Sequence, residues 1–318
     1  LGPVDVARLD FYEGGFAYRT RDLDVIAGGA TVVARGYFPD PGHWTPGKVW
    51  DLGDWQARLG DTVVATARDF IVHFGSKPST EVRARYGSML VRGASRVRAL
   101  SAAPTALRYR AHPEDVVVEA QREPYARFFS VEEADLSYRR FDGTMSPKVT
   151  RAAFVSGDAV TVLPYDPERQ RVLVIEQFRA GPHARGDGQP WQIEAIAGRI
   201  DPGETPEGAA RREAEEEAGL TLGNLVPVAS YYPSPGAMAE FLYSFVAVCD
   251  LPDGSAGIFG VAGEAEDIRG HLISLDDLLA LVGSGEVANA PLILTAFWLQ
   301  REKDRLRDAM HRAGSEPS

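Results

Sequence analysis

Gly198 to Leu220 reads GRIDPGETPEGAARREAEEEAGL, and this stretch determines how the second half of the 318-residue chain is interpreted. Thr205 is a common residue type at a helix N-cap, Pro206 suits the first helical position, and Gly219 suits the residue just past a helix end. These signals predict a helix from Pro206 to Ala218, about three and a half turns long.

Three glutamates of that helix, Glu213, Glu216 and Glu217, are spaced i, i+3 and i+4, so their carboxylates lie on one face. Like charges at these spacings destabilise an exposed helix by about 0.2–0.5 kcal/mol per pair, and Arg212 offsets only part of that. Mg²⁺ binds a few carboxylates, keeps some waters and fills its remaining positions with substrate phosphate oxygens. The glutamate face therefore predicts a divalent metal site, with a solvated helix face as the ordinary alternative.

The glutamates belong to a longer fixed pattern, G-x5-E-x7-R-E-U-x-E-E-x-G-U, in which U is an apolar residue. Seven fixed residues at about 7% usage each coincide by chance in about one window in 10⁸, which disfavours the solvated face. The pattern is similar to the Nudix box, and residues from about 113 to 301 resemble the Nudix hydrolases. That resemblance implies an α/β fold of the α/β/α sandwich type. It also implies Mg²⁺-dependent hydrolysis of a nucleoside diphosphate linked to another group, with Mn²⁺ as an alternative ion.

The same resemblance implies roles for single residues. The metal ligands would be the carbonyl of Ala197 and the carboxylates of Glu213, Glu216, Glu217 and Glu266. Glu264 would deprotonate the water that attacks the diphosphate and Glu266 would bind metal, and these two roles exchange easily. Glu216 is a further catalytic candidate. The ordinary alternative for Glu264 and Glu266 is a solvated, glycine-rich loop.

Features outside the box resemble the ADP-ribose pyrophosphatase branch of the family, among them the segment Ser234-Pro235-Gly236 with Glu240 and the acidic run 264–269. The branch implies a set of residues that contact substrate: Phe128, Arg151, Arg179, Glu194 and Glu240. Phe128 would stack on the adenine, from an amino-terminal arm that crosses the two-fold axis of a homodimer. An ordinary core position for Phe128 and a surface ion pair for Arg179 are the alternatives.

The amino-terminal part predicts a β-rich segment with a hairpin around Gly28-Gly29, followed by helices over 61–74 and 79–100. Residues 1–75 resemble the later half of a γ-glutamylcyclotransferase-like (AIG2-like) domain, in which Glu13 would be the acid/base. The domain is expected to be either incomplete or non-catalytic, because the loop that would hold substrate is expected upstream of Leu1. The ordinary alternative for Glu13 is a surface carboxylate beside a turn. Residues 76–110 are expected to be a helical linker, and 111–318 the hydrolase domain with its dimerisation arm. This order resembles the TrgB-type proteins of tellurite resistance.

In the hydrolase domain, strands are expected over 159–163, 171–178, 191–196 and 241–249, and helices from near Ser274 and from 288 to 313. The net charge of −11 disfavours a nucleic-acid partner. No apolar stretch is long enough for a membrane span, and the single cysteine, Cys249, suits a cytoplasmic location.

Three functions remain open at this point. The first is hydrolysis of ADP-ribose to AMP and ribose 5-phosphate. The second is hydrolysis of another nucleoside diphosphate sugar or of a dinucleotide. The third is a sensor that binds ADP-ribose without turnover, which the intact acidic box disfavours because a sensor does not need every metal carboxylate.

Overall fold

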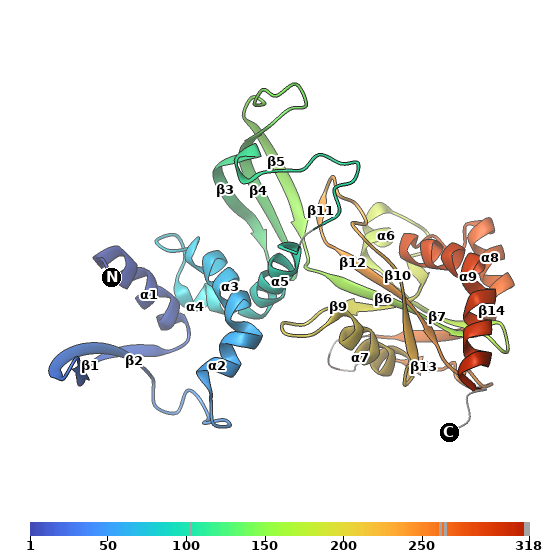
Figure 1. The fold of residues 1–318 in the computed structure, drawn as a ribbon, viewed down its shortest axis with the longest axis horizontal. Coiled ribbons are helices and arrows are strands. Elements are labelled where there is room, and N and C mark those ends of the chain that lie inside the picture. The colour runs from blue at the N-terminus through green and yellow to red at the C-terminus, as the bar shows by residue number, and fades with distance from the viewer. Residues whose placement is uncertain (102, 261–262, 264–265, 315–318) are drawn as a thin grey trace. The chain divides into compact units, whose positions relative to one another are not determined.

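The structure, a computed structural model, describes residues 1–101, 103–260, 263 and 266–314 (Figure 1). The chain divides into two compact units, Leu1–Val155 and Ser156–Ser318. This division falls inside the range 111–318 expected for the hydrolase domain, and the three domain ranges given above stay predictions.

The first unit begins with helices and a β-hairpin and ends with an antiparallel sheet. Its elements in chain order are α1 (Pro3–Gly15), β1 (Tyr18–Ala27), β2 (Ala30–Pro39), α2 (Leu52–Trp55), η1 (Gln56–Gly60), α3 (Asp61–Ile71), α4 (Ser79–Arg83), α5 (Tyr86–Ala99), η2 (Pro113–Asp115), β3 (Val116–Ala126), β4 (Ser130–Tyr138) and β5 (Val149–Val155). The predicted hairpin is confirmed, with Ala27 opposite Ala30 and both turn glycines at positive φ. Strand β4 pairs with β3 and with β5.

Helix α1 was not expected, because residues 3–15 show only short apolar runs between turn signals. Tertiary packing stabilises it: Phe11 and Tyr12 contact the buried ring of Phe70 on α3, at ring centroid distances of 5.3 and 5.0 Å. Val82 and Met89 complete this small core. A helix with little amphipathic signal can therefore form where aromatic side chains bury it.

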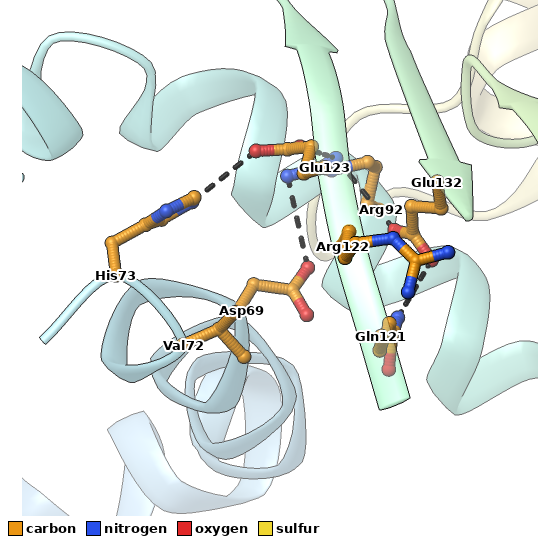
Figure 2. A pocket seen from close by; sticks show the side chains of 8 residues that line it. All are labelled: Asp69, Val72, His73, Arg92, Gln121, Arg122, Glu123 and Glu132. Carbon is orange, nitrogen blue, oxygen red and sulfur yellow. Dashed lines mark hydrogen bonds and ion pairs between the residues drawn. The ribbon is translucent and has the colours of Figure 1, made fainter. Parts of the chain in front are cut away.

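The prediction of one helix over 79–100 is wrong, because α4 and α5 are separate helices. The backbone leaves the helical conformation at Arg85, with φ −106° and ψ 10°. The Arg85 guanidinium instead joins a buried ion cluster around Glu123 of β3, with Arg85 Nη2 3.0 Å and Arg92 Nη1 2.7 Å from the Glu123 oxygens. His73 Nε2 lies 3.2 Å from Glu123 Oε2, and His73, Arg92 and Glu123 line a cavity of about 30 Å³ (Figure 2).

The second unit is a sheet with helices on both faces. Its elements are β6 (Ala159–Asp166), β7 (Arg171–Phe178), α6 (Ala180–Arg185), β8 (Trp191–Glu194), β9 (Ile196–Arg199), α7 (Pro206–Ala218), β10 (Asn224–Tyr231), β11 (Met238–Ala239), β12 (Leu242–Val248), β13 (Ile258–Phe259), β14 (Ile268–Ser274), α8 (Leu275–Ser284) and α9 (Ala290–Gly314). The strand order is β10-β12-β6-β7-β14-β13, with β8 paired to β7 and β9 to β6. Of the pairs in this order, β12 with β6 is parallel.

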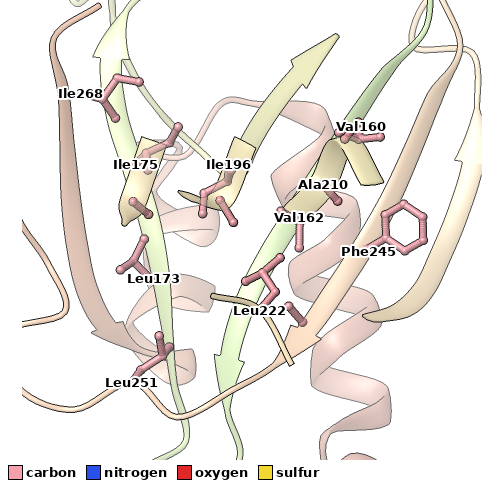
Figure 3. Close-up of a cluster of buried hydrophobic side chains, with 14 of the residues drawn as sticks. Val160, Val162, Leu173, Ile175, Ile196, Ala210, Leu222, Phe245, Leu251 and Ile268 are labelled. Atoms are coloured by element: carbon pink, nitrogen blue, oxygen red, sulfur yellow. The ribbon is translucent and has the colours of Figure 1, made fainter. Parts of the chain in front are cut away.

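Alternating side chains of the central strands form two cores. On β6, Val160 and Val162 face the core that includes the alanines of α7, and Figure 3 shows this cluster. Leu163 and Tyr165 face the opposite core, which α8 and α9 cover. Because successive strand residues point to opposite faces, this arrangement confirms the predicted α/β/α sandwich.

The stretch 191–196 was expected to be one strand, and it is two. Strand β8 pairs with β7, and β9 pairs with β6. The chain changes partner at the buried Ala195, whose small side chain packs in the second core. This change brings residues 196–199 beside α7.

Candidate active site

Helix α7 begins and ends at the residues that the sequence predicts. The Thr205 Oγ1 accepts a hydrogen bond from the Gly208 amide at 3.0 Å, which caps the N-terminus. Gly219 has φ 62°, and the Leu220 amide donates to the Ala214 carbonyl at 2.9 Å, as in a Schellman C-cap. Alanines of α7 face the first core, which fixes the direction of the other faces of the helix.

Arg212 holds the acidic side chains around it. Its Nη1 lies 2.7 Å from Glu213 Oε1 and 3.1 Å from Glu216 Oε2. Its Nη2 and Nε donate to the two oxygens of Glu204, and Nη2 also donates to the Arg199 carbonyl at 2.9 Å. One planar guanidinium thus fixes the loop before the helix and offsets the repulsion between two of the glutamates.

Glu217 is the most buried of the three glutamates, with 3% of its surface exposed. Its Oε2 accepts a hydrogen bond from the Ala197 amide of β9 at 3.0 Å. Burial raises the pKa of the Glu217 carboxyl to about 8, and repulsion from Glu213 and Glu266 adds to the increase. Burial also raises the pKa of Glu213, with Glu216 and Glu266 contributing.

The structure therefore brings Glu266 to the glutamate face of α7, although 49 positions of sequence separate it from Glu217. Its charge acts on both Glu213 and Glu217. Glu264, the other predicted base, lies outside the described residues.

The donor chemistry of this face fits a hard divalent cation. A Cβ built on Gly198 would fall on the Glu213 carboxylate, so the glycine leaves room for that group against β9. Buried carboxylates that repel each other are the partners that a divalent ion stabilises. Within the described ranges, no three acidic, histidine or cysteine side chains already form a complete cation site, and Arg212 holds two of the glutamates in ion pairs.

Arg179 stands beside the same carboxylates, since its charge opposes the increase in the pKa of Glu217. Arg179 Nε donates to Glu194 Oε2 at 2.7 Å, so the two predicted substrate contacts bind each other. The second oxygen of Glu194 accepts from Asn289 Nδ2 at 2.8 Å. The sequence analysis did not identify Asn289, and no local motif marks it.

The remaining predicted residues are divided between the two units. Glu240 belongs to the second unit, where Ser156 Oγ donates to its Oε1 at 2.9 Å and burial raises its pKa. Phe128 and Arg151 belong to the first unit. Phe128 lies between β3 and β4 and is 70% exposed, so the core interpretation of this ring is wrong. Arg151 lies on β5 and donates to the Thr150 carbonyl.

Glu13 lies in the last turn of α1, where burial raises its pKa. Burial raises the pKa of Tyr12 and of Tyr86, whose hydroxyls lie 2.6 Å apart, and the charge of Glu13 adds to both increases. Glu13 therefore stands next to a half-buried tyrosine pair of the first unit.

Comparison with known proteins agrees with the site. Residues 155–294 match the NUDIX domain model. The chain is 39% identical over 194 residues to the ADP-ribose pyrophosphatase of Escherichia coli (strain K12), covering 61% of this chain and 92% of that protein. It is 31% identical over 150 residues to the GDP-mannose pyrophosphatase of Enterobacter sp. (strain 638), covering 47% and 77%. A solved structure described as an ADP compounds hydrolase has a TM-score of 0.46 at 20% identity, covering 61% and 98%.

These matches show that the chain belongs to the Nudix family of hydrolases. Nudix ADP-ribose pyrophosphatases generally use a divalent metal ion, which agrees with the oxygen donors on α7. Among the described residues, no helix has the length and apolar character that crossing a membrane requires.

Proposed function

We propose that this chain hydrolyses the diphosphate of ADP-ribose to AMP and ribose 5-phosphate. The observation that carries the proposal is the glutamate face of α7, where Arg212 binds Glu213 and Glu216 and the Ala197 amide binds the buried Glu217. Relatives named ADP-ribose pyrophosphatase, at 39% identity over 92% of their length, support this substrate.

The metal in this proposal is Mg²⁺, with Mn²⁺ as an alternative, held by the Glu213, Glu216 and Glu217 carboxylates, the Ala197 carbonyl and Glu266. When bound, the ion neutralises phosphate charge and lowers the pKa of a water. The chain's own residues prepare this site. Arg212 holds Glu213 and Glu216 in place, and the Ala197 amide holds Glu217.

Proton transfer and substrate binding are assigned to the surrounding side chains. Glu264 or Glu266 takes the proton of the attacking water, and Glu216 is a further candidate for this role. The Arg179 guanidinium contacts the diphosphate, because its ion pair is with Glu194 and not with the glutamates of α7, which Arg212 binds. The remaining substrate contacts in this proposal are Phe128, Arg151, Glu194 and Glu240.

A GDP-sugar is the second candidate substrate, because relatives named GDP-mannose pyrophosphatase match at 31% identity over 77% of their length. An aromatic face such as that of Phe128 stacks on any base, so stacking does not separate adenine from guanine. The choice between the two rests on the higher identity and coverage of the ADP-ribose relatives.

A product assay on the purified full chain tests the proposal. The chain is incubated with Mg²⁺ and, in separate reactions, ADP-ribose, GDP-mannose and diadenosine polyphosphates, and the products are separated by chromatography. We expect AMP and ribose 5-phosphate from ADP-ribose at the highest kcat/KM, with no product when EDTA removes the metal. A higher kcat/KM for GDP-mannose would replace the proposed substrate, and binding of ADP-ribose without product would indicate a sensor.

We also infer a cytoplasmic homodimer of the TrgB type, in which residues 1–75 are a γ-glutamylcyclotransferase-like segment, 76–110 a linker and 111–318 the hydrolase domain. The β1–β2 hairpin and the position of Glu13 beside Tyr12 and Tyr86 support the cyclotransferase-like segment. Release of 5-oxoproline from γ-glutamyl peptides, compared between the unmodified chain and Glu13→Gln, tests whether this segment is catalytic. Light scattering tests the dimer.

A further inference from the structure

We propose that Asn289 is a positioning residue, which fixes the Glu194 carboxylate so that Glu194 orients the Arg179 guanidinium toward the diphosphate of the substrate. The proposal rests on the proposed function for the identity of that substrate. It concerns a residue directly before α9, 95 positions from Glu194.

The three side chains form a continuous chain of hydrogen bonds. Asn289 Nδ2 donates to Glu194 Oε1 at 2.8 Å, and Arg179 Nε donates to Glu194 Oε2 at 2.7 Å. Each oxygen of the carboxylate therefore has its own donor. Glu194 is 8% exposed, so its carboxylate has little solvent to bind and depends on these two donors.

Arg179 donates to Glu194 through Nε, and this bond does not use its two terminal nitrogens. The Arg179 side chain is 40% exposed, whereas its partner Glu194 is buried. A guanidinium fixed along one edge keeps its other donors in a defined direction, which favours an anion with fixed geometry. In the proposed function the anion that these donors bind is the diphosphate of the substrate.

Asn289 meets two requirements at once. Its Oδ1 accepts from the Leu292 amide at 3.0 Å, and its carbonyl accepts from the Ile293 amide at 3.0 Å, which is how an N-cap residue begins a helix. Its Nδ2 remains for Glu194. Serine caps helices as well as asparagine but is too short to replace the donor. Aspartate also caps helices, but it places a carboxylate oxygen opposite Glu194 in the position of the Nδ2 donor.

Because serine and aspartate both keep the cap but lack the donor to Glu194, variants of Asn289 distinguish a positioning role from a capping role. Asn289→Ser is compared with Asn289→Asp, and with Ser274→Ala as the matched control. Ser274 Oγ accepts from the Asp277 amide at 3.0 Å and caps α8, without contacting Glu194 or Arg179. The readouts are kcat and KM for ADP-ribose, and the Kd of inorganic diphosphate with Mg²⁺ by calorimetry.

We expect Asn289→Ser to raise KM and the diphosphate Kd about fivefold, with kcat changed less than twofold and the melting temperature close to that of the unmodified chain. Asn289→Asp should raise both constants further, because two carboxylates then face each other. Ser274→Ala should lower the melting temperature and leave both constants unchanged. In an Arg179→Lys background, Asn289→Ser should have little further effect, since the two residues act through one path.

Unchanged KM and Kd in Asn289→Ser would overturn the proposal, and so would equal effects of Asn289→Ser with and without Arg179. If the unmodified chain binds diphosphate but does not hydrolyse ADP-ribose, the proposed function fails, and the diphosphate Kd still decides the role of Asn289. If the unmodified chain binds no diphosphate, the role of Asn289 is also rejected.

Discussion

Glu217 on α7 and Ala197 on β9 are joined by a hydrogen bond, in which the Ala197 amide donates to Glu217 Oε2 at 3.0 Å. One oxygen of this buried carboxylate is thereby fixed to the sheet. The negative charges of Glu213 and Glu266 also act on this carboxylate. The bond aligns the glutamate face of α7 with the strand from which the Ala197 carbonyl would bind metal.

The first prediction concerns this carboxylate. Glu217→Gln keeps an oxygen that accepts from Ala197, so we expect the fold and the melting temperature to be retained. The negative charge is lost, and we expect kcat for the diphosphate substrate to fall by at least about 10²-fold, as for removal of one electrostatic group from an active site. Steady-state kinetics with Mg²⁺ measures the change.

Glu215→Gln is the matched control, because Glu215 is exposed on the same helix. It should retain nearly full activity. Near-normal turnover by Glu217→Gln would reject the metal assignment, whatever the result for Glu215.

The second prediction concerns the space that Gly198 leaves on β9. A Cβ at this position would fall on the Glu213 carboxylate, so Gly198→Ala must displace that side chain. Because displacements of about 1 Å can cost about 10²-fold in rate, we expect kcat to fall between about 10- and 10²-fold. The melting temperature should change little, since the Glu213 side chain can move toward solvent.

Gly181→Ala tests whether any added methyl group has this effect. A Cβ on Gly181 of α6 meets no atom within 4 Å, and the change should leave kcat unaltered. Equal activity of the Gly198 and Gly181 variants would contradict the close approach of β9 and Glu213.

Local signals predicted α7 from Pro206 to Ala218, because its N-cap, its first-turn proline and its C-terminal glycine all lie within the helix or next to it. Contacts between distant segments were beyond such signals. Helix α1 packs on Phe70, more than fifty residues away, and Arg85, where the backbone leaves the helical conformation, binds Glu123 of β3. A periodic pattern carries no information on a partner that lies in another element.

In the candidate site, too, local patterns identify some residues and only contacts between distant segments identify others. The glutamates on α7 are identified by their spacing, and the structure adds that Glu266 acts on the same face. Asn289 could not be found in this way. It occupies an N-cap, where asparagine is common, and only its distance to Glu194 shows a second role.

The third prediction is a pH dependence of stability at Asp166, which ends β6. The side chain is 2% exposed, and although burial alone raises its pKa, hydrogen bonds from the amides of Arg169 and Leu251 and from the Arg169 guanidinium hold the pKa below its usual range. A carboxyl whose pKa is lowered by folding stabilises the fold above the pKa of the unfolded state, about 3.9, and loses that effect as pH falls.

Asp166→Asn should therefore lower the free energy of unfolding by about 1–3 kcal/mol at pH 7, the range for hydrogen bonds to a charged group. The difference from the unmodified chain should shrink as pH falls below about 4. Urea unfolding at pH 7, 5 and 3.5 measures this trend. Asp308→Asn, at an exposed position of α9, should show no such gap. A difference that stays constant over this range would mean that the Asp166 charge does not stabilise the fold.

The fourth prediction compares two glycines of α5. A Cβ on Gly93 would lie 2.8 Å from the Thr62 carbonyl oxygen of α3 and closer still to the Thr66 hydroxyl, so the two helices approach each other through this glycine. Gly93→Ala should lower the free energy of unfolding by about 1–3 kcal/mol, the usual cost of overpacking.

Gly87 has no atom within 4 Å of the added carbon, and alanine is favoured over glycine in a helix. Gly87→Ala should therefore raise the same free energy by about 0.5–1 kcal/mol. The same glycine-to-alanine change at two positions of α5 should therefore shift the free energy of unfolding in opposite directions, as measured by urea unfolding. Shifts in the same direction would contradict the packing of α3 on α5.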